Sequence, residues 1–212
     1  MLEKYRTKKL QNKGQKLLVK GKIQKAYDIF QKVILLDNST ENIFNLAISL
    51  LSLNRFSEAE SYFQKIYENY PENELNMLSY ADCLMLQRKW QEAIPIFRSL
   101  SENNPKNKKY QFYEQISEDV IQREKYVRSR ELFNSAREEL NKKHDEKALK
   151  ILLEAYEYND KNPILLNNIA SLYIMKKDYA KAYNYLESAF KLDKENIRII
   201  KNMVLVKKKL KK

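Results

Sequence analysis

The sequence predicts an all-α solenoid in which antiparallel helix pairs stack on one another. Two observations support this fold class. The chain of 212 residues contains two glycines and four prolines, where average usage would give roughly fifteen and ten, so it lacks the turn formers of hairpins and phosphate-binding loops. A short pattern also recurs five times: a polar turn, an alanine, and an aromatic residue or leucine four positions later. Helices joined by short turns account for both observations.

The recurring alanines set the period of the repeat. Three of the four intervals between them lie within one residue of 34, and the remaining interval is 55. The alanines are Ala26, Ala59, Ala93, Ala148 and Ala182, and the residues four positions later are Phe30, Phe63, Phe97, Leu152 and Leu186. A period of this length is typical of repeat proteins built from helix pairs.

A second apolar pattern lies about twelve residues before each alanine and predicts the first helix of each pair. Its spacings of three, one and three residues place the apolar side chains on one helical face. In the second copy the pattern is Ile43, Leu46, Ala47 and Leu50. Gly14 takes the small slot in the first copy, and Gly21 falls in the turn between the two helices. Because one pair cannot cover its own apolar face, the copies must stack.

These features resemble the tetratricopeptide repeat, whose pattern ends in A-x3-F…P. The resemblance covers roughly residues 7–107 and 129–196, while Ser135 and Glu139 depart from it at slots that are normally apolar. It implies a right-handed superhelical solenoid that serves as a scaffold for protein–protein interaction and has no enzymatic activity. The repeat ending is best preserved at Ala59, Phe63 and Pro71, and again at Ala93, Phe97 and Pro105.

The one long interval places an insertion near residues 108–128, a segment without glycine or proline. We expect this segment to form one long helix with the residues after it, from about 107 to 142; a break around 123–129 is the alternative. The expected organisation is three helix pairs in 1–107, an inserted helix in 108–128, two helix pairs in 129–196 and a C-terminal capping helix in 197–212.

The capping helix is expected to bury an apolar stripe and to direct its lysines elsewhere, because the end of a solenoid needs a polar outer face. The stripe consists of Ile197, Ile200 and Val204, with Met203 beside it. The final residues of this helix are expected to fray.

The formal net charge of +12 is concentrated at the two ends of the chain. Residues 1–25 carry nine basic and one acidic side chain, and residues 191–212 carry nine and two, so the rest of the chain is slightly acidic. Lysines near a helix C-terminus are stabilised by the helix dipole. An alternative function is binding of a polyanion, RNA or an anionic membrane surface, through these basic ends. Nucleic acid is not the expected partner, because most tyrosines lie at the spacing of packed repeat stripes.

The sequence does not indicate an enzyme, a cofactor or a metal site. The single histidine, His144, lies in a polar turn, and the single cysteine, Cys83, lies in an apolar helix. One cysteine forms neither an internal disulfide nor a multi-cysteine zinc site. The apolar stretches are shorter than the 18 or so residues of a membrane span, and the first residues do not resemble a signal peptide. We therefore expect a cytoplasmic protein without a transmembrane segment.

The resemblance implies that the first helices of the repeats line a concave groove, and large apolar residues there would bind a peptide or helix of a partner protein. One alternative is that the inserted helix fills the groove, or that a second copy of the chain fills it and forms a homodimer or a structural oligomer. Another is that these helices have a different phase, so that other residues face the groove. Of the five positions of the family's carboxylate clamp, only Asn45 matches, so binding of acidic chaperone tails is not expected. The predicted groove residues are Phe44, Ile48, Leu51, Leu75, Leu78, Asp82 and Met85.

Overall fold

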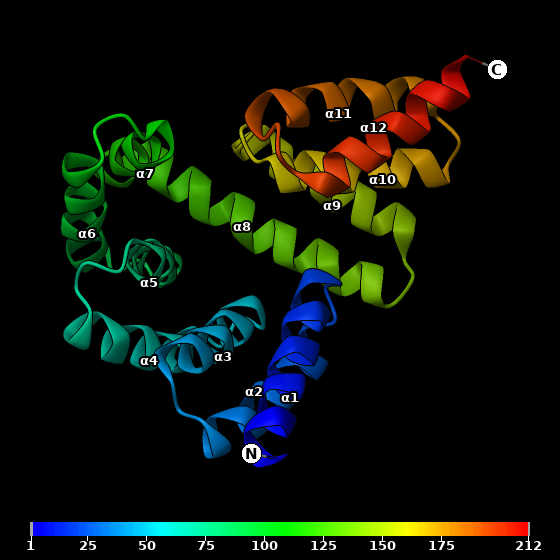
Figure 1. Cartoon of the computed structure of the whole chain (residues 1–212). Helices are drawn as coiled ribbons and strands as arrows, with labels where there is room; N and C mark the ends of the chain where they lie inside the picture. Colours follow the sequence, from blue (N-terminus) through cyan, green and yellow to red (C-terminus); the bar gives the residue numbers. More distant parts are fainter. Residues whose placement is uncertain (1, 212) are drawn as a thin grey trace. The chain divides into compact units, whose positions relative to one another are not determined.

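The structure is a computed structural model that describes residues 2–211. All regular secondary structure in that range is α-helical (Figure 1), which confirms the predicted fold class. The helices are α1 (Leu2–Val19), α2 (Ile23–Leu36), α3 (Thr40–Ser52), α4 (Phe56–Asn69), α5 (Glu74–Leu86), α6 (Trp90–Asn103), α7 (Lys108–Glu118), α8 (Val120–Asn141), α9 (Asp145–Tyr158), α10 (Pro163–Met175), α11 (Tyr179–Leu192) and α12 (Ile197–Leu210).

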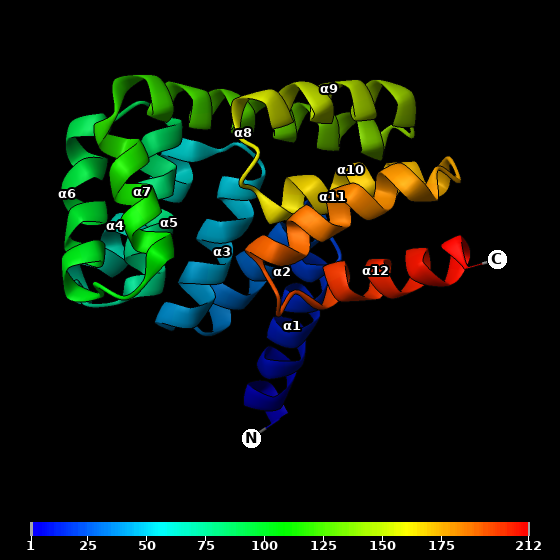
Figure 2. The ribbon, with the colours of Figure 1, turned by 90° about the horizontal axis from the view of Figure 1, so that it is seen from above.

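The chain divides into two compact units between Val120 and Ile121. In unit 1, which ends at Val120, α1 packs with α2, α3 with α4 and α5 with α6, and α7 packs against α6. In unit 2, side chains of α8 and α9 share one apolar cluster. Helix α10 packs with α11, and α12 packs against both (Figure 2). Consecutive helices within each unit run antiparallel, as the short connections require (Figure 1).

The repeated alanines and the residues four positions after them form the centre of each helix pair. All five alanines are fully buried, and the side chains of Phe30, Phe63, Phe97, Leu152 and Leu186 are at most 1% exposed. Alanine allows the two helices to approach closely, and the larger residue fills the space one turn later. The core therefore has the period of the sequence repeat.

The turn inside each pair uses one residue in the left-handed backbone region. Gly21 has φ +72°, and the same slot in later pairs holds Asn54, Arg88, Lys143 and Lys177 with φ between +59° and +63°. Many helices end with a residue in the left-handed region, and glycine adopts this conformation with the least steric strain because it has no Cβ. The turn of the first pair therefore has the least backbone strain.

Asparagine side chains cap the start of four helices. Asn73, Asn107, Asn162 and Asn196 each accept a hydrogen bond from a backbone N–H in the first turn of α5, α7, α10 and α12. Such a cap satisfies one of the unpaired N–H groups at a helix start. Asn107 follows Asn73, and Asn196 follows Asn162, by one repeat period, so the cap belongs to the repeat.

The expected single helix over 107–142 is two helices, so that prediction is wrong. Helix α7 ends at Glu118 and α8 begins at Val120, with extended backbone at Asp119 (φ −82°, ψ 117°). The break lies before the alternative position at 123–129. The physical reason is that α7 keeps the repeat phase: it begins one repeat period after α5, and its Tyr113 ring stacks on Phe97 with centroids 5.4 Å apart.

Helix α12 packs through a different face from the one expected. Ile199 and Val206 are fully buried and Met203 is 9% exposed, while Ile197, Ile200 and Val204 are 66%, 38% and 63% exposed. The expected burial of the latter three is therefore wrong. Asn202 fixes the orientation of the helix, because its Nδ2 donates to Asn167 Oδ1 at 2.9 Å and to Ser171 Oγ at 3.2 Å.

Replacing Gly14 by alanine is expected to lower the free energy of unfolding of the first helix pair by about 1–2 kcal/mol. A Cβ at Gly14 would lie 2.7 Å from Phe30 Cζ, and Phe30 is fully buried, so the ring must shift. Overpacking costs about 1–3 kcal/mol, and a fully buried ring belongs in the upper part of that range, about 2–3 kcal/mol. The better helix propensity of alanine offsets about 1 kcal/mol. Urea unfolding followed by circular dichroism measures the loss, and Asn12→Ala on the exposed side of α1 is the control. Equal or higher stability of Gly14→Ala would contradict the close packing.

Candidate functional site

The seven predicted groove residues lie on matching positions of the neighbouring helices α3 and α5. We call them the first-helix row: Phe44, Ile48 and Leu51 on α3, and Leu75, Leu78, Asp82 and Met85 on α5. Phe44 and Leu78, Ile48 and Asp82, and Leu51 and Met85 are three pairs of equivalent positions, each one repeat period apart. The row is thus one repeated helical face within unit 1.

The residues of the first-helix row differ widely in exposure. Leu75 is 61% exposed, whereas Met85 is fully buried and Leu51 is 8% exposed. Phe44, Ile48, Leu78 and Asp82 are half-buried. Met85 and Leu51 therefore do not offer side-chain surface to a partner in this structure. Sequence periodicity placed the row on one face but could not tell which of its members are covered.

Phe44 also contributes to the packing of its own helix pair. Its ring meets the buried Phe63 ring edge to face, with centroids 5.9 Å apart.

The positions that correspond to the family's carboxylate clamp are Gln11, Gln15, Asn45, Leu75 and Ser79. Gln11 is buried, Gln15 donates to Glu41, and Ser79 donates to the Leu75 carbonyl. These positions carry no basic side chain where the family's clamp has cations, so they form no carboxylate-binding site of that kind.

The α2–α4 cleft, a hollow of about 690 Å³ in unit 1, was not predicted from the sequence. Leu46 and Leu50 of α3, each 1% exposed, lie at its base, and Leu35 of α2 is 84% exposed at its wall. A leucine this exposed beside an apolar base is available for a contact. The cleft is lined by Tyr27, Asp28, Gln31, Lys32, Ile34, Leu35, Leu46, Leu50, Glu58 and Tyr62.

An ion pair shapes the polar edge of the α2–α4 cleft. Arg55 donates through Nε and Nη2 to the two carboxylate oxygens of Glu58, both at 2.6 Å, and its guanidinium lies 4.6 Å from the centroid of the Tyr27 ring. The hydrogen bonds from Arg55 lower the pKa of Glu58. Bidentate pairing and stacking on an aromatic ring both favour arginine over lysine here.

Cys83 is a buried core residue. Its side chain is fully buried, and its thiol donates to the Phe56 carbonyl with Sγ 3.4 Å from the oxygen. Burial raises the pKa of this thiol to about 12, so it is protonated at neutral pH. Because the thiolate is the nucleophilic form of cysteine, Cys83 is unsuited to nucleophilic catalysis.

His144 belongs to a structural cluster around Glu139, one of the departures from the apolar repeat slots. His144 Nδ1 lies 2.9 Å from one Glu139 oxygen, and Lys142 and Lys147 approach the carboxylate at 3.1 and 3.3 Å. Hydrogen bonds from His144 and Lys142 lower the pKa of Glu139 to about 2. The buried carboxylate is thus compensated by three partners. Among the described residues, no group of three or more histidine, cysteine or acidic side chains could hold a metal ion.

Comparison with known protein families identifies the repeat. Two models described as "Tetratricopeptide repeat" match residues 50–112 and 164–196. The chain is a tetratricopeptide-repeat protein. The first match extends from α3 into α7, in agreement with the repeat phase of α7, and the second covers α10, α11 and the connection to α12. Proteins of this family are typically protein–protein interaction modules.

Solved structures of other tetratricopeptide-repeat proteins resemble the fold at low sequence identity. YrrB, described as a TPR protein with an unusual peptide-binding site, is 16% identical, covers 91% of this chain and 89% of its own, and has a TM-score of 0.45. TTC0263 from Thermus thermophilus is 14% identical, with coverage of 97% and 100% and a TM-score of 0.49. MamA from Desulfovibrio magneticus RS-1 is 14% identical, with coverage of 90% and 97% and a TM-score of 0.44.

A comparison with curated proteins finds no similar sequence. In the described part of the chain, none of the helices has both the length and the apolar character needed to cross a membrane.

Proposed function

We propose that this protein is a non-enzymatic interaction module that binds an apolar peptide or helix of a partner protein on unit 1. The observation that supports this best is the α2–α4 cleft. Its volume of about 690 Å³ lies within the range of ligand pockets, about 300–1,000 Å³. It combines an apolar base, an exposed leucine and two tyrosines, and aromatic residues are enriched where proteins bind one another.

The chemistry of the cleft defines the kind of segment that it would accept. Leu35 offers aliphatic surface to a leucine or aromatic side chain beside the buried Leu46 and Leu50. Asp28, Lys32 and Glu58 offer polar contacts around it. An amphipathic helix presents such anchors at positions i, i+3 and i+4. The partner segment is therefore expected to be amphipathic, with one or two large apolar anchors.

The first-helix row is the second contact surface in this proposal. Leu75 is exposed, and Phe44, Ile48 and Leu78 keep part of their surface accessible. A partner that used this surface would rest on α3 and α5. The walls of the cleft belong to α2 and α4, so a substitution can change one surface without changing the other.

Leu35→Glu is expected to weaken peptide binding at least tenfold. A carboxylate placed at the apolar wall would lose its hydration when a peptide covers it, and burying an unpaired charge is costly. The probe is a peptide selected by display against the full chain and measured by isothermal titration calorimetry. Leu36→Glu is the matched control, because Leu36 is 52% exposed and does not line the cleft. It should change the affinity less than twofold.

Leu75→Glu is the corresponding substitution in the first-helix row. Loss of binding with Leu75→Glu but not with Leu35→Glu would locate the peptide on the row and refute the cleft as the contact site. If no displayed peptide binds the full chain with a dissociation constant below about 100 µM, the interaction function itself is refuted. Light scattering over a range of protein concentrations measures the self-association alternative: a stable dimer whose formation blocks the peptide would also overturn the proposal.

A further inference from the structure

The outward face of α12 is an aliphatic surface that the fold leaves uncovered. Ile197, Ile200 and Val204 follow one another at three- and four-residue spacing, so they lie on one side of the helix. They are 66%, 38% and 63% exposed, and Leu205 beside them is 43% exposed. Ile199 and Val206 on the opposite side are fully buried in the apolar cluster of unit 2. Helix α12 is thus attached through one apolar face and presents a second one.

The repeat phase identifies this surface as a face that a preceding first helix buries. Helix α12 begins one repeat period after α10, so it takes the place of a first helix, and Ile200 and Val204 correspond to Leu166 and Ala170. Both of those residues are fully buried in the cluster that α10 forms with α11 and α12. No described helix follows α12 to cover Ile200 and Val204 in the same way.

The sequence of α12 is poorly suited to bind a second helix of the usual kind. Val204 stands where α3, α5 and α10 have a small residue, Ala47, Ala81 and Ala170, so a helix could not approach as closely. Lys207 and Lys208 stand where α10 has Tyr173 and Ile174. A helix that packed over this half of α12 would bury two ammonium groups, which is costly without paired carboxylates.

The charge of α12 favours an anionic surface. The helix contains five basic residues and no acidic residue. Lys207 lies over the Tyr183 ring, with Nζ 5.8 Å from its centroid. Lys201, Lys208 and Lys209 are exposed, and within residues 2–211 none of them forms an ion pair. Flexible lysines beside an aliphatic stripe can bind lipid phosphates while the stripe enters the acyl boundary.

We propose that α12 docks on the surface of an anionic lipid bilayer, lying parallel to it with Ile197, Ile200 and Val204 in the interface. The aliphatic stripe decides between a membrane and a nucleic acid, since phosphate binding on RNA would need the lysines but not exposed isoleucine and valine. The inference is independent of peptide binding, because α12 belongs to unit 2 and the candidate peptide surfaces belong to unit 1.

Vesicle flotation with the full chain tests the proposal. The vesicles contain one part phosphatidylglycerol to two parts phosphatidylcholine, with pure phosphatidylcholine as the uncharged comparison, at low and physiological salt. Wild-type protein is expected to float with the anionic vesicles and to remain unbound with the neutral ones. Failure to bind anionic vesicles at low salt would overturn the proposal.

Two sets of variants separate the aliphatic and the basic contributions. Ile197→Asn with Val204→Asn keeps every charge and should lower the partition coefficient at least tenfold. Neutralising Lys201, Lys208 and Lys209 with glutamine should lower it about a hundredfold, since each lysine near an anionic surface contributes about fivefold. Because all five side chains are exposed, circular dichroism should show an unchanged fold.

Matched controls test whether the effect belongs to α12. Lys8, Lys9 and Lys13 changed to glutamine remove the same charge from α1, the other basic end, and Ile164→Asn removes an exposed aliphatic residue from α10; each should change the partition coefficient less than twofold. An equal loss with the α1 variant would mean diffuse electrostatic attraction and refute the assignment.

Two other results would assign α12 a different partner. Binding to single-stranded RNA that survives Ile197→Asn with Val204→Asn, without vesicle binding, would assign α12 to nucleic acid instead. Concentration-dependent dimers that Val204→Asn abolishes would assign it to self-association.

Discussion

Replacing Phe63 by alanine is expected to lower the free energy of unfolding of unit 1 by about 3–5 kcal/mol, the usual cost of truncating a buried phenylalanine. Phe63 is fully buried at the centre of the second helix pair. Its ring contacts Phe44 of the partner helix, so truncation would leave a cavity between α3 and α4. The backbone around it is tied to the next repeat, because Asn76 Nδ2 donates to the Phe63 carbonyl at 3.0 Å, which limits collapse of the cavity.

Hydrogen exchange measured by mass spectrometry localises this loss better than a global melt, because stacked repeats need not unfold as one cooperative unit. Amides of α3, α4 and α5 should lose protection in Phe63→Ala, and those of α10 and α11 should change little. Phe63→Leu is the matched control: unit 2 has leucine at this slot in Leu152 and Leu186, so it should lose less than half as much stability. A loss below about 1 kcal/mol in Phe63→Ala would contradict the assigned core position.

The helix pairs could be predicted from the sequence because the same contacts recur in every repeat. Burial of an alanine and of a large residue four positions later leaves the same pattern each time, as Ala26 with Phe30 and Ala182 with Leu186 show. Each contact is local and depends little on distant parts of the chain. For this reason the period, the fold class and the turn at Gly21 are all visible in the residues.

The ends of the repeat arrays were harder to predict. Helix α12 has two aliphatic stripes, one through Ile197 and Val204 and one through Ile199 and Val206, and hydropathy alone does not say which of them packs. The break at Asp119 has neither glycine nor proline to mark it. A signal was present nevertheless: Asn107 follows Asn73 by one repeat period, and a capping asparagine in phase indicates that a new first helix begins there.

The candidate contact surfaces depend on packing that a single helix does not encode. Periodicity placed Leu75 and Met85 on the same face, but 61% of Leu75 is exposed and none of Met85. The α2–α4 cleft depends on the separation of two helices across α3, and its exposed Leu35 lies outside the buried stripe of α2. The role of Glu139 likewise depends on the three-dimensional structure. Its carboxylate at a normally apolar slot is explained by Lys142, His144 and Lys147, which the turn between α8 and α9 brings close to it.

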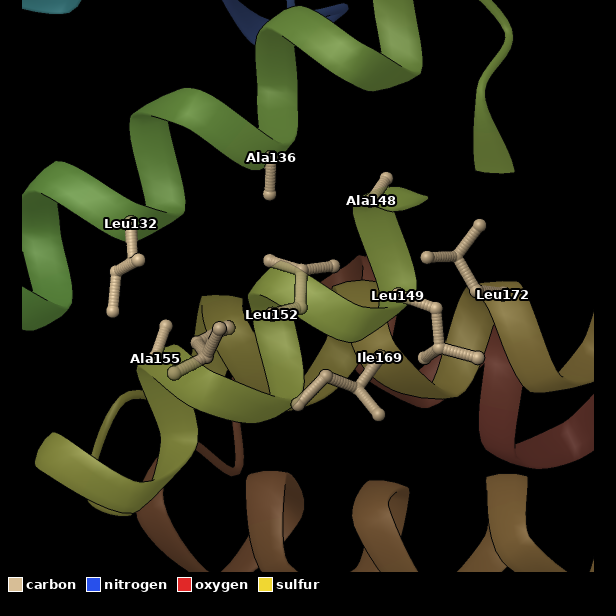
Figure 3. Close-up of a cluster of buried hydrophobic side chains, with 9 residues drawn as sticks. Leu132, Ala136, Ala148, Leu149, Leu152, Ala155, Ile169 and Leu172 are labelled. Atoms are coloured by element: carbon tan, nitrogen blue, oxygen red, sulfur yellow. The ribbon is translucent and has the colours of Figure 1, made fainter. Parts of the chain in front are cut away.

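Leu152→Ala is expected to lower the stability of unit 2 by about 2–5 kcal/mol. Leu152 is 1% exposed and lies within the cluster that α8, α9 and α10 form (Figure 3). Figure 3 shows its side chain between α9 and the segment of α8 that bears Ala136. The cluster also contains Ala148 and Ala155, whose short side chains cannot reach into a cavity. The site would therefore relax poorly, which favours the upper part of this range.

Leu152→Met is the matched control, because a volume-conserving replacement costs less than about 1.5 kcal/mol. Leu152→Phe tests whether slots are interchangeable between the two units. Phenylalanine is native at this slot in unit 1, but in unit 2 the half-buried rings of Phe133, Tyr156 and Tyr173 already pack against the cluster. The larger ring should thus overpack and cost about 1–3 kcal/mol. Unchanged or increased stability of Leu152→Phe in urea unfolding would mean that this core has spare volume and would contradict its assigned close packing.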